Sequence, residues 1–350
     1  MATLYATATA YPPHRYEQEE VIRTLPLWLE GDQRMLALAR RVFENAAVQT
    51  RYGCRPLLDL ARPLSLTETS HLYQRSACAL GEQVVKDCLT QATVTPEAVD
   101  LIISTSCTGF MIPSLDAYLA NHFGFSPHLK RLPVTELGCA AGAMALARAH
   151  DYLRAFPHHT VLVVAVELPS LTFQFRDLSA ANVVSSALFG DGAVAVLLRG
   201  ERQAGKPQII ATESTLFPHT TAVMGFELKD SGFHIVLSTE IPELVRREVP
   251  GLVARFLDQH GYTAHDITHF LLHPGGRRVL EGLVEALGIT EAHAEISRTI
   301  LRDYGNLSSA AVLCILDRFL KSQQPRQGDL GLLLAFGPGF SAETVLLRWG

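Results

Sequence analysis

The sequence contains no Cys-x-x-Cys pair, the spacing from which most structural zinc sites are built. Its six cysteines are far apart, and most of them stand in apolar, helix-like or strand-like segments: they occupy positions 54, 78, 88, 107, 139 and 314. A chain of 350 residues has enough apolar sequence for a large core without disulfide cross-links. We therefore predict reduced thiols in a cytoplasmic protein and neither a zinc site nor a disulfide framework.

The sequence also lacks an excess of positive charge. Thirty Lys and Arg stand against 35 Asp and Glu, for a net charge of −5. This balance argues against a nucleic-acid or anionic-membrane partner, although it leaves room for a local basic patch that binds a phosphorylated ligand. Long apolar runs are absent too. The longest ones, such as residues 161–166, have only the length of a β-strand, so no membrane span is predicted. The first residues have no charged start followed by an apolar core, and we expect no secretory signal.

Short β-branched or aliphatic runs alternate with longer amphipathic stretches, a pattern typical of layered α/β folds. The predicted strands cover 99–105, 159–167, 193–200, 267–273, 331–336 and 343–350. Helices are predicted over 71–92 and 242–261. The second of these contains Pro250, which we expect to kink or split it.

The same order of motifs occurs twice along the chain. In each half a strand and a loop precede a glycine that opens a helix of small residues, at 137–153 and again at 304–320. Ser104 precedes Cys139 by 35 residues, and His273 precedes Asn306 by 33. We predict two related halves, residues 1–200 and 201–350, with the polar segment 200–208 as the link between them.

If the two halves pack face to face, equivalent positions meet near the axis that relates them. Cys139 and Asn306 are such equivalents, and His273 closes a strand ahead of Asn306. Each residue also has a purely structural interpretation: a core thiol, a hydrogen-bonded histidine at a strand end, and a helix-capping asparagine. As an active site, a thiol at a helix start would have a lowered pKa, and Gly138 would permit the tight turn that presents it.

Five motifs in this order and spacing, LGCAAG, ALFGDGA, HPGG, YGNLSSA and AFGPGFSAETVLL, resemble those of the thiolase superfamily and specifically of the chalcone-synthase-like type III polyketide synthases. The segment STSCTGFMIPSLDAYL is similar to the bacterial members. The resemblance covers essentially the whole chain. It implies a five-layered αβαβα fold, a homodimer, CoA thioesters as substrates, and neither a metal nor a cofactor.

The resemblance also implies residue roles. The family's nucleophile falls on Cys139, and its histidine and asparagine fall on His273 and Asn306. Seven further residues match positions at the entrance or wall of the family's cavity: Phe189, Phe233, Cys107, Glu167, Thr172, Gly225 and Ser308. For the CoA phosphates, the segment 39–53 offers Arg40, Arg41 and Arg51, although each of these is also an ordinary surface arginine by composition.

For the product, residues 223–245 resemble the bacterial alkylpyrone-forming group, which predicts a fatty acyl-CoA starter extended with malonyl-CoA. The alternative is a malonyl-only synthase that makes a phenolic ring of the tetrahydroxynaphthalene or phloroglucinol type, because SCTGFM also resembles that group. A ketoacyl carrier-protein synthase of the priming type uses the same three residue types. A non-catalytic partner subunit with this fold is the alternative from a different class.

Overall fold

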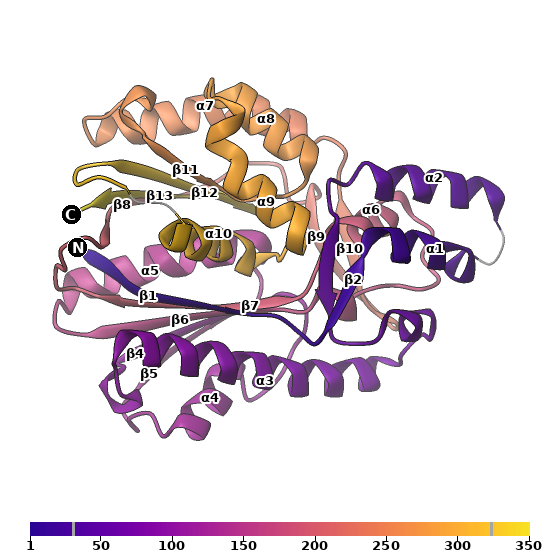
Figure 1. Ribbon diagram of the computed structural model, residues 1–350, viewed down its shortest axis with the longest axis horizontal. Helices are drawn as coiled ribbons and strands as arrows, with labels where there is room; N and C mark the ends of the chain where they lie inside the picture. The colour runs from indigo at the N-terminus through magenta and orange to yellow at the C-terminus, as the bar shows by residue number, and fades with distance from the viewer. Residues whose placement is uncertain (30–31, 323–324) are drawn as a thin grey trace.

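The computed structural model describes residues 1–29, 32–322 and 325–350. Figure 1 shows a sheet with helices above it, below it and in its middle. Its nine strands run in the order β11 (His269–Leu272), β12 (Leu330–Gly337), β13 (Ser341–Trp349), β8 (Pro207–Leu216), β1 (Ala2–Ala10), β7 (Gly192–Arg199), β6 (Thr160–Glu167), β4 (Leu101–Thr105) and β5 (Lys130–Val134). All six predicted strands belong to this sheet, which confirms those predictions.

The duplication predicted from the sequence is confirmed by the topology. The first half runs β1, α3 (Leu66–Ala92), β4, α5 (Ala141–Ala155), β6, β7; the second runs β8, α7 (Ile241–Gln259), β11, α10 (Ser309–Ser322), β12, β13. In each half the second strand pairs parallel to the third, the third antiparallel to the fourth, and the fourth antiparallel to the first. The halves join where β1 pairs with β8 at Ala2–Ile209 and Thr3–Gln208. Segment 200–208 lies at the connection from β7 to β8, and the domain bounds themselves stay a prediction.

The helices and sheet strands form five layers (Figure 1). Helices α5 and α10 lie in the middle, and both are apolar on nearly all sides because strands of both halves cover them. Helices α3 and α4 (Leu115–Phe123) cover the outer face of the first half. On the other outer face lie α7, α8 (Arg277–Leu287) and α9 (Glu295–Tyr304). The predicted αβαβα layering is confirmed.

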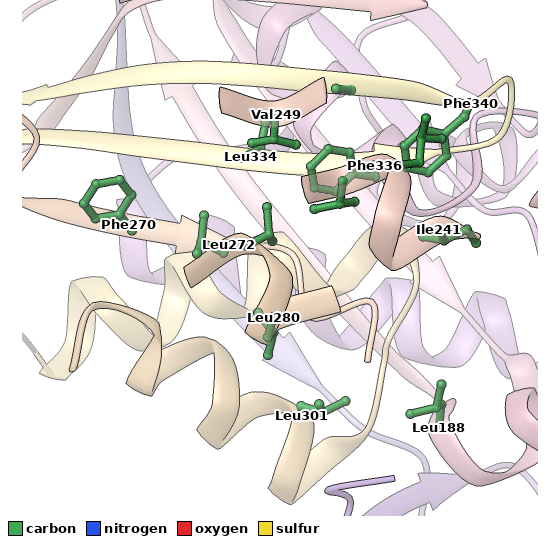
Figure 2. Close-up of a cluster of buried hydrophobic side chains, with 14 of the residues drawn as sticks. Leu188, Ile241, Val249, Phe270, Leu272, Leu280, Leu301, Leu334, Phe336 and Phe340 are labelled. Carbon is green, nitrogen blue, oxygen red and sulfur yellow. The ribbon is translucent and has the colours of Figure 1, made fainter. Parts of the chain in front are cut away.

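Figure 2 shows the outer core of the second half, where apolar side chains of α7 and α8 meet those of two strands. Leu272 of β11 and Leu334 of β12 are fully buried, as is Leu280 of α8, and Val249 of α7 is 1% exposed. These contacts also explain why Pro250 does not split α7, which is one helix from Ile241 to Gln259. The expected kink stays a prediction. Proline removes only the hydrogen bond to the carbonyl of Arg246, and the buried face of the helix is retained on both sides of it.

The remaining elements gather at one end of the sheet, at the right of Figure 1. They are α1 (Gln18–Trp28), α2 (Gln33–Glu44), α6 (Ala180–Leu188), the hairpin β9 (Met224–Lys229) and β10 (Gly232–Leu237), and the pair β2 (His14–Glu17) and β3 (Thr50–Gly53). Each pair of strands forms a small sheet of its own. Among the helices described, none combines the length and the apolar character needed to cross a membrane.

Candidate active site

A cavity of about 1060 Å³ opens at this end of the molecule. Cys139 from the first half and His273 and Asn306 from the second half all line it. The three side chains that the sequence singled out therefore face one space, although they are up to 167 positions apart in the chain. A volume at the upper end of the range for ligand sites can hold a substrate of considerable size.

Cys139 lies in a single 3₁₀ turn, Gly138–Ala140, directly ahead of α5. Gly138 has a φ of +49°, and a Cβ on it would lie 2.6 Å from Cδ of Pro338, so only glycine fits this turn. The Cys139 side chain is nearly buried, at 8% exposure, and its thiol donates to the Ser308 hydroxyl at 3.5 Å.

The expected lowering of the Cys139 pKa was wrong in direction. Burial raises the pKa of this thiol to about 12, against the opposing effect of hydrogen bonds with Ser308 and Asn306. The reason lies in the surroundings: the side chain is shielded from water, and this effect of burial is larger than that of the hydrogen bonds that favour the thiolate. Before substrate arrives, the sulfur carries its proton.

His273 follows the last residue of β11, and its backbone N–H donates to the carbonyl of Leu334 at 2.9 Å. Burial lowers its pKa to about 3. Among the residues that the structure describes, none hydrogen-bonds the buried Nδ1 of His273, so no acceptor stabilises a second ring proton. The lowered pKa of His273 and the raised pKa of Cys139 both favour the neutral side chain in the cavity that they line.

Asn306 is held by backbone on both sides. Gly305, with φ at +74°, turns the chain after α9, and the Asn306 N–H donates to the Leu188 carbonyl at 2.8 Å. Its Oδ1 accepts from the Ser308 N–H at 2.8 Å. The side chain thus accepts a backbone hydrogen bond just ahead of helix α10, as expected of a helix-capping asparagine. It also hydrogen-bonds Cys139.

The cavity residues expected from the resemblance fall into two groups. Phe189, Phe233, Cys107, Thr172, Gly225 and Ser308 line the cavity. Glu167 does not: as the last residue of β6 it is fully buried behind the wall, and the expectation that it lines the cavity was wrong. It accepts hydrogen bonds from the Cys107 N–H at 3.1 Å and from the Thr108 hydroxyl at 2.8 Å. Burial raises the pKa of Glu167.

Comparison with known proteins identifies the family. Residues 1–201 match the N-terminal domain of the chalcone and stilbene synthases, and residues 208–349 match their C-terminal domain. The chain belongs to this family. It is thus a type III polyketide synthase, an acyltransferase that uses CoA thioesters, and the alternatives of a carrier-protein synthase and of a non-catalytic partner are set aside.

Two relatives and one solved structure illustrate the likeness. A 1,3,6,8-tetrahydroxynaphthalene synthase of Streptomyces peucetius is 42% identical over 98% of this chain and 92% of its own. The crystal structure of the synthase of the same name from Streptomyces coelicolor superposes with a TM-score of 0.95 at 34% identity, over 99% of both chains. An alpha-pyrone synthesis polyketide synthase-like protein of Mycobacterium tuberculosis is 28% identical over 99% of this chain and 91% of its own. These values favour the malonyl-only alternative over the alkylpyrone prediction.

The arginines of this type III polyketide synthase differ from expectation. Arg41 is exposed and lines the cavity, and Arg40 is exposed but outside the lining. Arg51 also lines the cavity, but it is buried, and its guanidinium donates to the Ser186 and Phe189 carbonyls and to the Gln18 side chain.

Two arginines that the sequence analysis missed, Arg277 and Arg278, line the cavity at the start of α8. Their position directly after HPGG was the available signal, because the residues next to a loop that reaches the cavity reach it as well.

Proposed function

We propose that this type III polyketide synthase uses malonyl-CoA for both starter and extension and releases an aromatic polyhydroxy product of the tetrahydroxynaphthalene type. The observation that carries the product assignment is the 42% identity to a synthase of that name over nearly the whole chain. The cavity shared by Cys139, His273 and Asn306 supports the chemistry. Ten ring carbons correspond to five two-carbon units, so the same site acts repeatedly on one chain.

In the loading step, Cys139 is the nucleophile. Its sulfur attacks the thioester carbonyl of the starter, the bond from the carbonyl carbon to the CoA sulfur breaks, and the acyl group remains on Cys139. Because the thiol is neutral in the free site, the proton moves to His273 as the carbon–sulfur bond forms and then to the departing CoA sulfur. Burial opposes free charges, which favours this coupled transfer over a standing ion pair.

In the extension step, His273 and Asn306 act on malonyl-CoA. Loss of carbon dioxide leaves an enolate whose negative charge lies on the thioester oxygen. An imidazole N–H and an amide N–H donate to that oxygen without adding a charge to the site. The side chains of Phe189 and Phe233 line the same space, and apolar surroundings disfavour the ionised carboxylate more than the dispersed charge of the enolate.

The enolate carbon then attacks the acyl group on Cys139. A carbon–carbon bond forms, the carbon–sulfur bond breaks, and the lengthened chain is again a CoA thioester that returns to Cys139. Ring closure follows in the same cavity, walled by Cys107, Thr172, Gly225 and Ser308. Arg41 supplies a positive charge at the cavity for the CoA phosphates.

We also propose that two copies of the chain associate and that the protein acts in the cytoplasm. Phe110 and Ile112, in the loop between β4 and α4, are 58% and 81% exposed. Large apolar side chains in such a position are typical of a subunit contact, which supports the dimer. Sedimentation of the purified protein tests it, and a monomer at micromolar concentration would reject the dimer.

The experiment for the function is incubation of purified protein with isotope-labelled malonyl-CoA, alone and with a panel of fatty acyl-CoA starters, followed by mass spectrometry. Malonyl-CoA alone should give a ten-carbon product with label in every two-carbon unit. Long-chain pyrones that form only when a fatty acyl-CoA is present would contradict the proposed product. A product with a single six-carbon ring would contradict the proposed five two-carbon units. Absence of carbon dioxide release with any starter would reject the enzyme assignment.

The Cys139→Ala variant is the control for the mechanism. It should lose condensation and retain malonyl decarboxylation, because His273 and Asn306 remain in place. Condensation at the normal rate in this variant would contradict the assignment of the nucleophile.

A further inference from the structure

One wall of the cavity is the hairpin β9–β10. Six of its residues line the cavity: Met224, Gly225, Phe226, Phe233, Ile235 and Leu237. The hairpin forms a two-stranded sheet of its own, and its residues range from partly buried to exposed apart from Gly232. Phe226 and Phe233 contact each other edge to face at 5.8 Å between ring centres. An isolated two-stranded hairpin is marginally stable, so its position depends on what holds it from outside.

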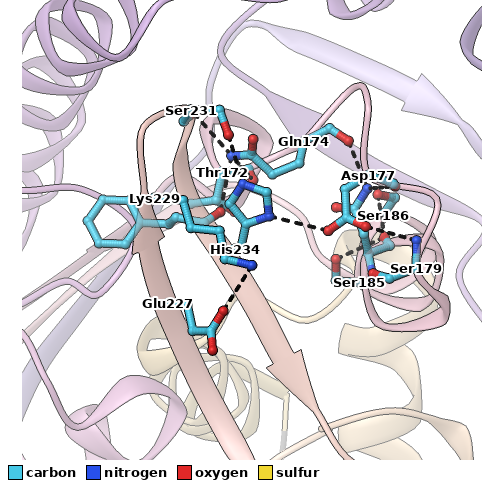
Figure 3. Close-up of polar contacts among 12 residues, drawn as sticks. Thr172, Gln174, Asp177, Ser179, Ser185, Ser186, Glu227, Lys229, Ser231 and His234 are labelled. Carbon is cyan, nitrogen blue, oxygen red and sulfur yellow. Dashed lines mark hydrogen bonds and ion pairs between the residues drawn. The ribbon is translucent and has the colours of Figure 1, made fainter.

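The loop after Thr172 supplies one such restraint (Figure 3). The side-chain amide of Gln174 donates to the Phe233 carbonyl at 3.1 Å and to the Ser231 carbonyl at 3.4 Å. The residue between Ser231 and Phe233 must be glycine for these hydrogen bonds to form. Gly232 has a φ of +119°, and a Cβ on it would lie 3.3 Å from Nε2 of Gln174. Gln174 is 9% exposed, so these hydrogen bonds are shielded from water.

A second restraint joins Asp177 to His234. His234 Nδ1 lies 3.4 Å from the Asp177 carboxylate, and its Nε2 hydrogen-bonds the Ser231 hydroxyl at 2.7 Å. The two side chains of the pair are only 22% and 17% exposed. Burial acts to raise the Asp177 pKa, but hydrogen bonds from Ser179 and His234 hold it below its ordinary value. Asp177 therefore presents a carboxylate to the hairpin at neutral pH.

The loop that carries Gln174 and Asp177 is itself fixed to helix α6. Asn182, 2% exposed, donates from its amide to the Gln174 carbonyl at 2.9 Å and to the Asp177 carbonyl at 2.6 Å. The same helix ends at Leu188, and the next residue, Phe189, lines the cavity and pairs with Asn306. Helix α6 thus positions Phe189, which directly follows it, and also Phe233, through the loop that carries Gln174.

We propose that Gln174, Asp177 and His234 are positioning residues that hold the β9–β10 wall, and through it decide how many two-carbon units are added before the chain leaves. This inference rests on the proposed function, because it concerns the growing chain in that cavity. A poly-β-keto chain is reactive along its whole length. A wall at a fixed distance keeps the chain extended until its last unit is added, whereas a loose wall lets it fold early and leave as a smaller lactone.

The test uses two nearly isosteric variants of the full-length enzyme, Gln174→Glu and Asp177→Asn. A carboxylate at 174 cannot donate to the Phe233 carbonyl, and an amide at 177 removes the charge opposite His234. With malonyl-CoA as substrate, we expect lactones with fewer units to rise at least fivefold relative to the main product. Carbon dioxide release should stay within twofold of wild type, because Cys139, His273 and Asn306 are unchanged.

Lys229→Gln is the matched control. Lys229 lies on the same hairpin and pairs with Glu227 at 2.9 Å (Figure 3), and removing it should leave the product ratio unchanged. An unchanged product ratio in both Gln174→Glu and Asp177→Asn would overturn the proposal. So would a parallel fall of carbon dioxide release and all products, since that pattern indicates general damage to the site. The readout is the ratio among whatever products the wild type makes, so a wrong product under the proposed function leaves this test intact.

Discussion

The sulfur of Cys139 lies 3.5 Å from the hydroxyl oxygen of Ser308, which connects the nucleophile proposed for the first half to the loop that carries Asn306 in the second. The same hydroxyl lies 3.3 Å from the sulfur of Cys107. Burial raises the pKa of the Cys139 thiol, the hydrogen bond with Ser308 opposes that rise, and the nearby Glu167 carboxylate adds to it. The surroundings of Cys139 therefore suit a protonated thiol in the free enzyme.

The reactivity of Cys139 should accordingly depend steeply on pH. With the pKa raised to about 12, the thiolate fraction grows about tenfold per pH unit over the whole range from pH 6 to 9. Iodoacetamide alkylation of the Cys139 peptide, followed by mass spectrometry, should rise in the same way. The His273→Gln variant should show the same slope. An alkylation rate that levels off between pH 6 and 8 in the wild type, but not in His273→Gln, would show a thiolate–imidazolium pair. It would contradict a neutral Cys139 thiol and a neutral His273 in the free enzyme.

Replacement of Asn306 should slow malonyl decarboxylation. We expect Asn306→Ala to raise the activation free energy of decarboxylation by about 2.7–4 kcal/mol, as the loss of an oxyanion donor does in other enzymes. The change also removes the acceptor of the Ser308 N–H. Asn306→Asp is the matched variant, because it keeps that acceptor, loses the amide donor and adds a negative charge that also opposes the enolate. Normal carbon dioxide release from Asn306→Asp would refute the oxyanion role.

Much of this arrangement could be predicted from the sequence, because the duplication is visible as repeated motifs. Strands such as β6 and β12 are continuous apolar runs, and the glycines before Cys139 and Asn306 mark the two equivalent turns. Strand β1 gave a weaker signal, since it consists mostly of alanine and threonine. Its assignment depends on pairing with β7 and β8, which are distant in the chain.

The rest depends on distances that no local pattern contains. The direction of the Cys139 pKa follows from burial by both halves, which outweighs the helix start that the sequence shows. Glu167 ends an apolar strand and could face either side of the wall. The contacts from Gln174 and Asp177 to the hairpin span about sixty positions and involve ordinary polar residues. Such contacts become visible only when the loop, α6 and the hairpin are placed in space.

The packing of the two central helices gives the last prediction. A Cβ on Gly142 of α5 would lie 2.1 Å from the carbonyl oxygen of Ser309 and 3.2 Å from Leu313, so α5 and α10 approach more closely than alanine allows. Gly142→Ala should destabilise the protein by about 1–3 kcal/mol through overpacking. The same change at Gly251 of α7, where a Cβ would have no described atom within 4 Å, should stabilise it by about 0.4–1 kcal/mol. Thermal unfolding of both variants measures the difference. Equal midpoints would mean that the central helices can separate to admit a methyl group, which would contradict the close contact that brings the Cys139 and Asn306 turns to one cavity.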